Sequence, residues 1–91
     1  MYTVEYANSF RRDLKRCAKR GYRVDDLFDA IETLRLTGTL PPQYRPHKLT
    51  GNYAGLWECH IKPDWLLVWA QNDEVLTLLM TNTGTHADLF G

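Results

Sequence analysis

The spacing of apolar residues changes once along this chain, and the change restricts the folds that the chain can adopt. Two apolar stripes at helical spacing come first: Phe10, Leu14, Cys17 and Ala18, then Leu27, Phe28, Ile31 and Leu34. Residues 55–61 instead alternate between apolar and polar side chains, which is typical of a strand buried on one face. Two helices are therefore expected to precede a region of strands.

Capping and breaking residues predict where the helices begin and end. Asn8 or Ser9 offers an N-cap to the first helix, and Gly21 offers its end. The second helix is expected to begin near residues 25–26, where two aspartates suit a helix N-terminus, and to end near Gly38. Residues 39–47 contain three prolines, which lack a backbone donor, so no regular structure is expected there.

The remaining segments complete an α+β fold. Strands are predicted over residues 1–6, 55–61, 65–70 and 75–81, with turns at 62–64 and 72–73. Short connections favour an antiparallel arrangement of the last three strands, and two amphipathic helices would cover one face of the sheet. We therefore expect one domain over residues 1–91 with the order β-α-α-β-β-β.

The alternation in residues 55–61 also predicts what each face of the sheet carries. Trp57, Cys59 and Ile61 would point toward the helices, whereas Leu56, Glu58 and His60 would lie on the opposite face. No further helix is predicted to cover that face. It is therefore expected to be open to solvent or to form a concave site.

Composition argues against a membrane or exported protein. The longest apolar run, residues 65–70, is too short to span a bilayer, and residues 1–13 contain no apolar signal region. Cys17 and Cys59 do not make a disulfide framework and are expected to be buried thiols. We expect a reduced, cytoplasmic protein.

Positive charge is concentrated in and just after the first predicted helix. Between residues 11 and 23 there is one acid, Asp13. The cations of this segment are Arg11, Arg12, Lys15, Arg16, Lys19, Arg20 and Arg23. From Gly51 onward the only Lys or Arg is Lys62. Such a block indicates either a local anionic partner, such as nucleic acid or an acidic protein, or a solvated helix face.

All three histidines follow residue 46, each at the end of a predicted element. They are His47, His60 and His86, and histidine is the side chain best suited to proton transfer near neutral pH. If they converge on the open face, they could act as base and acid on a phosphodiester. Their spacing, with Cys59, matches no common zinc site.

The stretch TGTHADLFG, residues 83–91, predicts an ordered turn. Thr85 and Asp88 resemble a capping box, which would place His86 at a helix N-terminus where free N–H groups can hold a phosphate. Leu89 would anchor this turn, and Phe90 is either a second anchor or an exposed ring on which a base could stack.

Asp64 and Trp65 follow the turn at residues 62–64. Asp64 is a turn former that could also accept a proton or orient a histidine, and Trp65 is either a core residue or the edge of a site. No Gly-rich phosphate loop and no G-x-S-x-G motif occurs.

Two long stretches, HKLTGNYAGLWECHIKPDWLLVW and TGTHADLFG, resemble the YafQ branch of the RelE/ParE toxin superfamily. The resemblance extends over nearly the whole chain and implies a RelE-like fold. It implies a ribosome-dependent endoribonuclease (mRNA interferase) of a type II toxin–antitoxin pair, without metal or cofactor. The implied partners are a DinJ/RelB-type antitoxin, the ribosome, messenger RNA and, through the antitoxin, operator DNA.

The resemblance also implies roles for individual residues. Catalytic roles fall on His47, His60, Asp64 and His86, with His86 as general acid and the base left open between Asp64 and His60. Substrate contacts fall on Trp65 and Phe90, to which we add Lys62, Asn82 and Thr85. The cations from Arg11 to Arg20 would contact ribosomal RNA.

Asn82 departs from the family pattern, which has an arginine immediately before Thr-Gly-Thr-His. An arginine there would stabilise charge that develops on the scissile phosphate. Lys62 or Lys48 could supply that charge instead. The alternatives are a toxin-fold protein that binds an antitoxin with weak or no nuclease activity, and a ParE-like gyrase inhibitor, against which the histidines argue.

Overall fold

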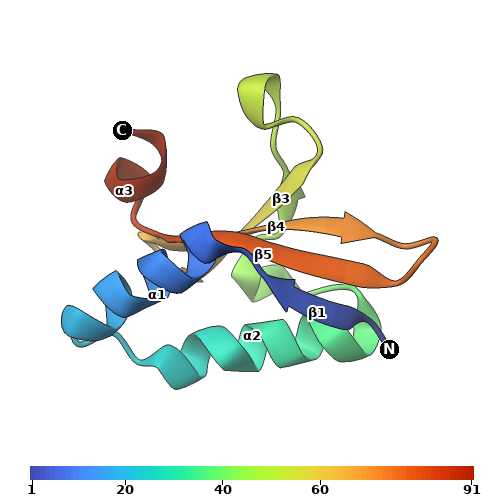
Figure 1. The fold of residues 1–91 in the computed structure, drawn as a ribbon, viewed down its shortest axis with the longest axis horizontal. Helices are drawn as coiled ribbons and strands as arrows, with labels where there is room; N and C mark the ends of the chain where they lie inside the picture. Colours follow the sequence, from blue (N-terminus) through green and yellow to red (C-terminus); the bar gives the residue numbers. More distant parts are fainter.

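Five strands form one sheet in the order β1-β5-β4-β3-β2, in a computed structural model that describes residues 1–91. The strands are β1 (Thr3–Tyr6), β2 (His47–Lys48), β3 (Leu56–Lys62), β4 (Trp65–Asn72) and β5 (Thr77–Gly84). The helices are α1 (Asn8–Lys19), α2 (Val24–Thr37) and α3 (His86–Phe90), with 3-10 turns η1 (Pro42–Tyr44) and η2 (Gly51–Tyr53). Figure 1 shows α2 on one side of the sheet, whereas α3 and η2 project on the other. The α+β prediction is confirmed.

The sheet contains one strand more than the sequence predicted. His47 and Lys48 pair antiparallel with Glu58 and Trp57, although residues 39–47 were expected to be irregular. The prolines before them lack N–H groups, but His47 and Lys48 both have one, so a two-residue edge strand can form. This short strand matters because it brings His47 beside β3. The other antiparallel pairs are β3–β4 and β4–β5, and β1 pairs parallel with β5.

The expected N-cap of α1 was wrong. The helix begins at Asn8, with Ala7 as the cap residue and no side-chain cap bond. The Ser9 hydroxyl donates instead to the Thr81 carbonyl at 2.6 Å. A hydrogen-bond acceptor 72 residues away in sequence has therefore replaced the local cap. Local sequence patterns cannot reveal such a distant partner. The predicted end of α2 is confirmed, since Gly38 is left-handed (φ 74°) and its N–H reaches the Leu34 carbonyl.

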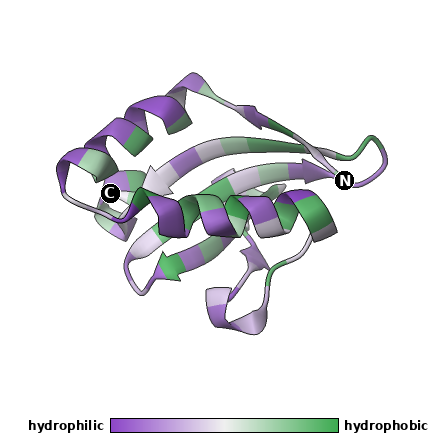
Figure 2. Cartoon of the chain, turned by 90° about the horizontal axis from the view of Figure 1, so that it is seen from below, coloured by the Kyte–Doolittle hydropathy of each residue, from purple (hydrophilic) through white to green (hydrophobic).

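One apolar core fills the space between the two long helices and the sheet. Its buried members are Phe10, Cys17, Leu27, Ala30, Ile31, Leu34, Cys59, Ile61, Trp65, Leu67, Trp69, Leu78 and Met80. Figure 2 shows α2 lying across the strands, with hydrophobic and hydrophilic residues interspersed along it. Both cysteines are free and buried, as expected. Burial raises the pKa of the Cys59 thiol to about 12, so this thiol is unreactive at neutral pH.

Helix α1 closes the edge of β5 where β1 stops. The parallel pairing ends at Tyr6 and Met80, which leaves the next residues of β5 without a neighbouring strand. Ser9 binds there through Thr81, and the buried Asp13 carboxylate accepts from the Thr83 N–H (3.2 Å) and the Asn82 side chain (2.9 Å). Side chains of one helix thus satisfy backbone groups that a sheet edge would otherwise leave open. None of the helices is long and apolar enough to cross a bilayer.

Candidate active site

The three histidines converge on the side of the sheet opposite α2, as predicted. His47 on β2 lies 6.3 Å from His60 on β3, measured between ring centroids, and His60 lies 5.9 Å from His86 at the start of α3. His47 pairs with Glu58, and His60 is two residues further along β3 on the same face. We call His47, His60 and His86 the histidine row.

Glu58 lies beneath this row, on the predicted face, but its burial was not predicted. The sequence placed it on an open face, but the residue is buried, with 5% of its surface exposed. Its Oε1 lies 3.3 Å from His47 Nε2 and 3.9 Å from His60 Nε2. The only signal in the sequence was that Glu58 and His60, two residues apart in a predicted strand, share one face. Pairing with β2, which was not expected, is what brings His47 over the carboxylate.

Backbone carbonyls fix which nitrogen of each ring carries a proton. His60 Nδ1 lies 3.1 Å from the Pro63 carbonyl, and His47 Nδ1 lies 3.0 Å from the Arg45 carbonyl. A carbonyl oxygen only accepts, so Nδ1 must be the donor in both rings. The Nε2 atoms of both rings are consequently the ones that face Glu58 and can exchange protons.

Asp64 orients His86, one of the two functional roles that the sequence allowed. Asp64 Oδ1 accepts from His86 Nδ1 at 2.6 Å and from the His86 backbone N–H at 2.9 Å. These two hydrogen bonds lower the pKa of Asp64 below its ordinary value. The aspartate is therefore a carboxylate at neutral pH, the proton lies on His86 Nδ1, and His86 Nε2 is left free for a substrate.

The predicted capping box is present at the start of α3. Thr85 Oγ1 accepts from the Asp88 N–H at 3.0 Å, and Asp88 Oδ2 accepts from the Thr85 N–H at 2.9 Å. Arg20 of α1 binds both Asp88 oxygens, at 2.5 and 3.0 Å. The paired guanidinium holds the pKa of Asp88 well below its usual range. A helix of five residues is thus anchored to α1 through its capping residue.

Only part of the basic stretch on α1 is free for a partner. Arg16 pairs with Asp13 at 3.2 Å, Arg20 pairs with Asp88, and Arg11 Nε donates to the Tyr6 carbonyl at 3.5 Å. The cations that make no ion pair are Arg11, Arg12, Lys15 and Lys19. Arg16 and Arg20 are thus committed within the protein, and an anionic partner stays a prediction for the unpaired cations.

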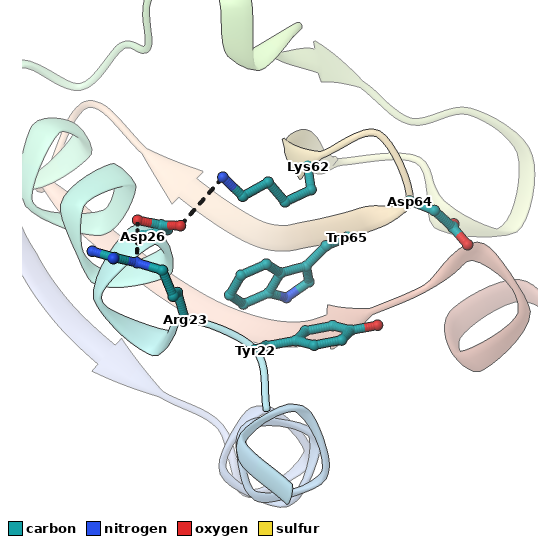
Figure 3. A pocket seen from close by; sticks show the side chains of 6 residues that line it. All are labelled: Tyr22, Arg23, Asp26, Lys62, Asp64 and Trp65. Atoms are coloured by element: carbon teal, nitrogen blue, oxygen red, sulfur yellow. Dashed lines mark ion pairs between the residues drawn. The ribbon is translucent and has the colours of Figure 1, made fainter. Parts of the chain in front are cut away.

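Lys62 and Trp65 do not join the histidine row. Figure 3 shows both at a cavity of about 360 Å³ beside α2, where Lys62 Nζ pairs with Asp26 at 3.3 Å. Trp65 is 3% exposed, and its indole N–H donates to Thr83 Oγ1 at 2.9 Å. Trp65 is thus a buried core residue, and Lys62 is paired with α2 rather than placed beside the histidines. Lys48 is also directed elsewhere, with its Nζ 5.6 Å from the centre of the Trp57 ring.

Asn82 and Phe90 lie next to the row. Asn82 Nδ2 donates to the Asp13 carboxylate at 2.9 Å, so its amide is already engaged. Phe90 is 39% exposed and meets Tyr53 edge to face, with ring centroids 4.9 Å apart. Phe90 is therefore both packed and accessible.

The fold is that of YafQ toxins, with the histidine row on the sheet face opposite α2. Residues 2–91 match the family model described as bacterial toxin of type II toxin–antitoxin system, YafQ. The chain belongs to this YafQ family.

Similar proteins agree with this assignment. The chain is 36% identical over 90 residues to the mRNA interferase toxin YafQ of Escherichia coli K12, covering 97% of this chain and 95% of that protein. A crystal structure of the E. coli DinJ–YafQ complex matches with a TM-score of 0.85 and 33% identity over 100% of both chains. A metal-bound toxin from Helicobacter pylori matches with a TM-score of 0.89 and 36% identity, over 99% of this chain and 100% of that one.

Proposed function

We propose that this chain is an endoribonuclease toxin that cuts messenger RNA on the ribosome. The observation that carries the proposal is the pair formed by His60 and His86, whose ring centroids are 5.9 Å apart on one face. Each ring has its Nδ1 hydrogen-bonded, which leaves Nε2 as the atom that can exchange a proton and suits a base and an acid close together. The mRNA interferase named among the relatives supports RNA as that substrate.

The proposed reaction is an internal transfer at one phosphodiester. His60 Nε2 takes the proton of the 2′-hydroxyl, O2′ bonds to phosphorus, and the bond from phosphorus to O5′ breaks. His86, protonated on Nε2, gives its proton to the departing O5′. The products are a 2′,3′-cyclic phosphate and a 5′-hydroxyl, and the transfer itself requires no metal or cofactor.

The hydrogen bonds favour His60 over Asp64 as the base. Asp64 already accepts two hydrogen bonds from His86, and its lowered pKa makes it a weak base at neutral pH. Glu58 lies near the Nε2 atoms of His60 and His47, where a negative charge stabilises a ring that has gained a proton. We assign His47 a supporting position on the same carboxylate.

Partners follow from the family and from the free surface. The DinJ–YafQ complex supports a DinJ/RelB-type antitoxin as the partner of this chain. We propose that this antitoxin neutralises the toxin and connects it to operator DNA. Lys15 and Lys19, which make no ion pairs, are the cations that we propose for contact with ribosomal RNA. We place the action of the toxin in the cytoplasm, where translating ribosomes are found.

Mapping mRNA ends after induction tests the proposal. Primer extension should show new ends within translated messages, and these ends should disappear when the start codon is removed. Ends that persist without translation would contradict ribosome dependence. The absence of both cuts and growth arrest would contradict nuclease activity.

A second candidate is an antitoxin-binding protein with little nuclease activity. The engagement of Asn82 with Asp13 favours it, because no cation stands at that position. This candidate predicts normal capture of the antitoxin with no mRNA cuts. Gyrase inhibition gives no role to the histidine row and is the least supported alternative.

A further inference from the structure

A second cavity, of about 200 Å³, lies on the same side of the sheet as the histidine row. Its walls carry Arg12 and Arg16 of α1, Tyr53 of η2 and Phe90 of α3, over a floor that includes Val68 and Asn82. Asp13 and Asp88 also border it, but their carboxylates are held by Asn82, the Thr83 N–H, Arg16 and Arg20. Ligand pockets for drug-sized molecules usually measure roughly 300–1,000 Å³, so this cavity suits one small group rather than a large cofactor.

Strand register connects the cavity to the row. Glu58, beneath the histidines, pairs with Val68, and Val68 pairs with Asn82. Neighbouring strands are about 4.8 Å apart, so Asn82 lies about 10 Å from Glu58 across the sheet. A strand of RNA that passes over the histidines can therefore reach the cavity within a nucleotide or two.

The two arginines have hydrogen-bonding capacity to spare. Arg12 makes no ion pair or hydrogen bond with the protein. Arg16 pairs through Nη2 with Asp13 at 3.2 Å and through Nε with Asp88 at 3.8 Å, which leaves its Nη1 without a partner. The Nε is itself buried and has no acceptor within hydrogen-bond distance. Buried donors without partners are uncommon, and guanidinium groups bind phosphate oxygens in pairs.

The opposite wall is aromatic. Tyr53 and Phe90 are 43% and 39% exposed, and their rings meet edge to face, which leaves ring surface available to the cavity. Nucleotide bases stack on such rings with little dependence on sequence. Two guanidinium groups facing two aromatic rings are the chemistry that recognises a single nucleotide.

We propose that this cavity is a nucleotide subsite that holds the RNA next to the cut, with a phosphate on Arg12 and Arg16 and a base against Tyr53. The inference rests on the proposed nuclease function. It also gives α1 a direct part in substrate binding, distinct from contact with the ribosome. Arg12 and Arg16 of α1 then supply the positive charge that Asn82 lacks. Lys62 and Lys48 do not supply it, because one pairs with Asp26 and the other lies over Trp57.

Arg12→Ala tests the phosphate contact, with Arg35→Ala on α2, across the sheet from the cavity, as the matched control. Arg12 makes no ion pair, and Arg35 pairs with the exposed Glu32 of its own helix, so both variants should fold. In single-turnover cleavage on programmed ribosomes at saturating toxin, Arg12→Ala should be slower by about tenfold or more. Arg35→Ala should cleave at the wild-type rate. Equal rates for the two variants would overturn the proposal.

Tyr53→Ala and Tyr53→Phe test the base contact. The phenylalanine variant should cleave like wild type, whereas the alanine variant should be slower by about tenfold, because stacking needs the ring and not the hydroxyl. Equal losses in both variants, or none in either, would contradict a base at this wall.

A binding measurement separates failure of the subsite from failure of the nuclease proposal. Ribosomes are loaded with mRNA that has a 2′-deoxynucleotide at the A-site position, so that it cannot react, and are compared with empty ribosomes. Arg12→Ala should weaken binding to the loaded ribosomes only, and Lys15→Ala should affect both equally. If Arg12→Ala weakens binding to the loaded ribosomes only, but the wild type never cuts RNA, the subsite proposal holds and the nuclease proposal is wrong. If wild type cuts and Arg12→Ala binds normally, the subsite is wrong.

Discussion

Replacing Asp13 with alanine should destabilise the protein by about 3 kcal/mol. The carboxylate is 4% exposed and accepts from the Thr83 N–H, the Asn82 amide and Arg16. Thr83 is fully buried, so its N–H would lose its only acceptor, which costs roughly 1–3 kcal/mol. The partly buried Asn82 amide adds about 1 kcal/mol, while Arg16 is 36% exposed and can turn to water at little cost.

Urea denaturation followed by circular dichroism measures this change. Asp29→Ala is the control, because Asp29 is an exposed aspartate of α2 whose side chain makes no hydrogen bond or ion pair. It should change the free energy of unfolding by no more than about 0.5 kcal/mol. Asp13→Asn keeps one acceptor oxygen and should fall between the two. A value for Asp13→Ala within 0.5 kcal/mol of the control would refute the argument that this carboxylate holds the edge of β5.

Four further predictions concern the site. His86→Ala should abolish cleavage yet unfold at the wild-type temperature, because the side chain is 55% exposed; a large drop in melting temperature would instead make the residue structural. Asp64→Asn should slow cleavage by about 10–100-fold at unchanged antitoxin binding, since it loosens the ring that it orients, and an unaltered rate would rule that role out. Cleavage by metal-free protein should continue in EDTA under conditions that keep the ribosome intact, whereas loss that zinc or copper restores would require a metal. The lowered pKa values of Asp64 and Asp88 keep their contacts complete above the ordinary aspartate pKa near 3.8 and remove them as the pH falls through the lowered values. The side-chain carboxyl ¹³C signals of Asp64 and Asp88 should therefore titrate only below about pH 4, and titration of either carboxyl near pH 6 would contradict this assignment.

Local patterns predicted the parts of the fold that depend on neighbours in sequence. The capping box of Thr85 and Asp88 spans four residues, and the end of α2 at Gly38 depends on one backbone angle. The two helices and the three later strands followed from the spacing of apolar residues. Each of these could be predicted because the chemistry that decides it lies within one turn or one strand.

Contacts between distant residues could not be predicted in the same way. Asn82 and Asp13 are 69 residues apart, and nothing near either one indicates the other. The burial of Glu58 depends on a two-residue strand after a proline-rich segment, where propensity favours no strand. Lys62 is the only cation after residue 50, yet tertiary structure pairs it with Asp26 on α2. Position in a motif therefore located the histidines but not the cations that accompany them.

The construction of α3 has a consequence for how activity responds to heat or denaturant. This helix has five residues, none of them buried, and is too short to persist without its anchors. Its ties to Arg20 and Asp64 are exposed polar contacts, whereas the core lies on the other side of the sheet. Such a segment opens at a lower free-energy cost than the whole domain. Activity should thus be lost when α3 opens locally, under conditions that leave the fluorescence of the buried tryptophans unchanged. The amides of residues 86–90 should likewise exchange with solvent at a lower opening free energy than those of β4.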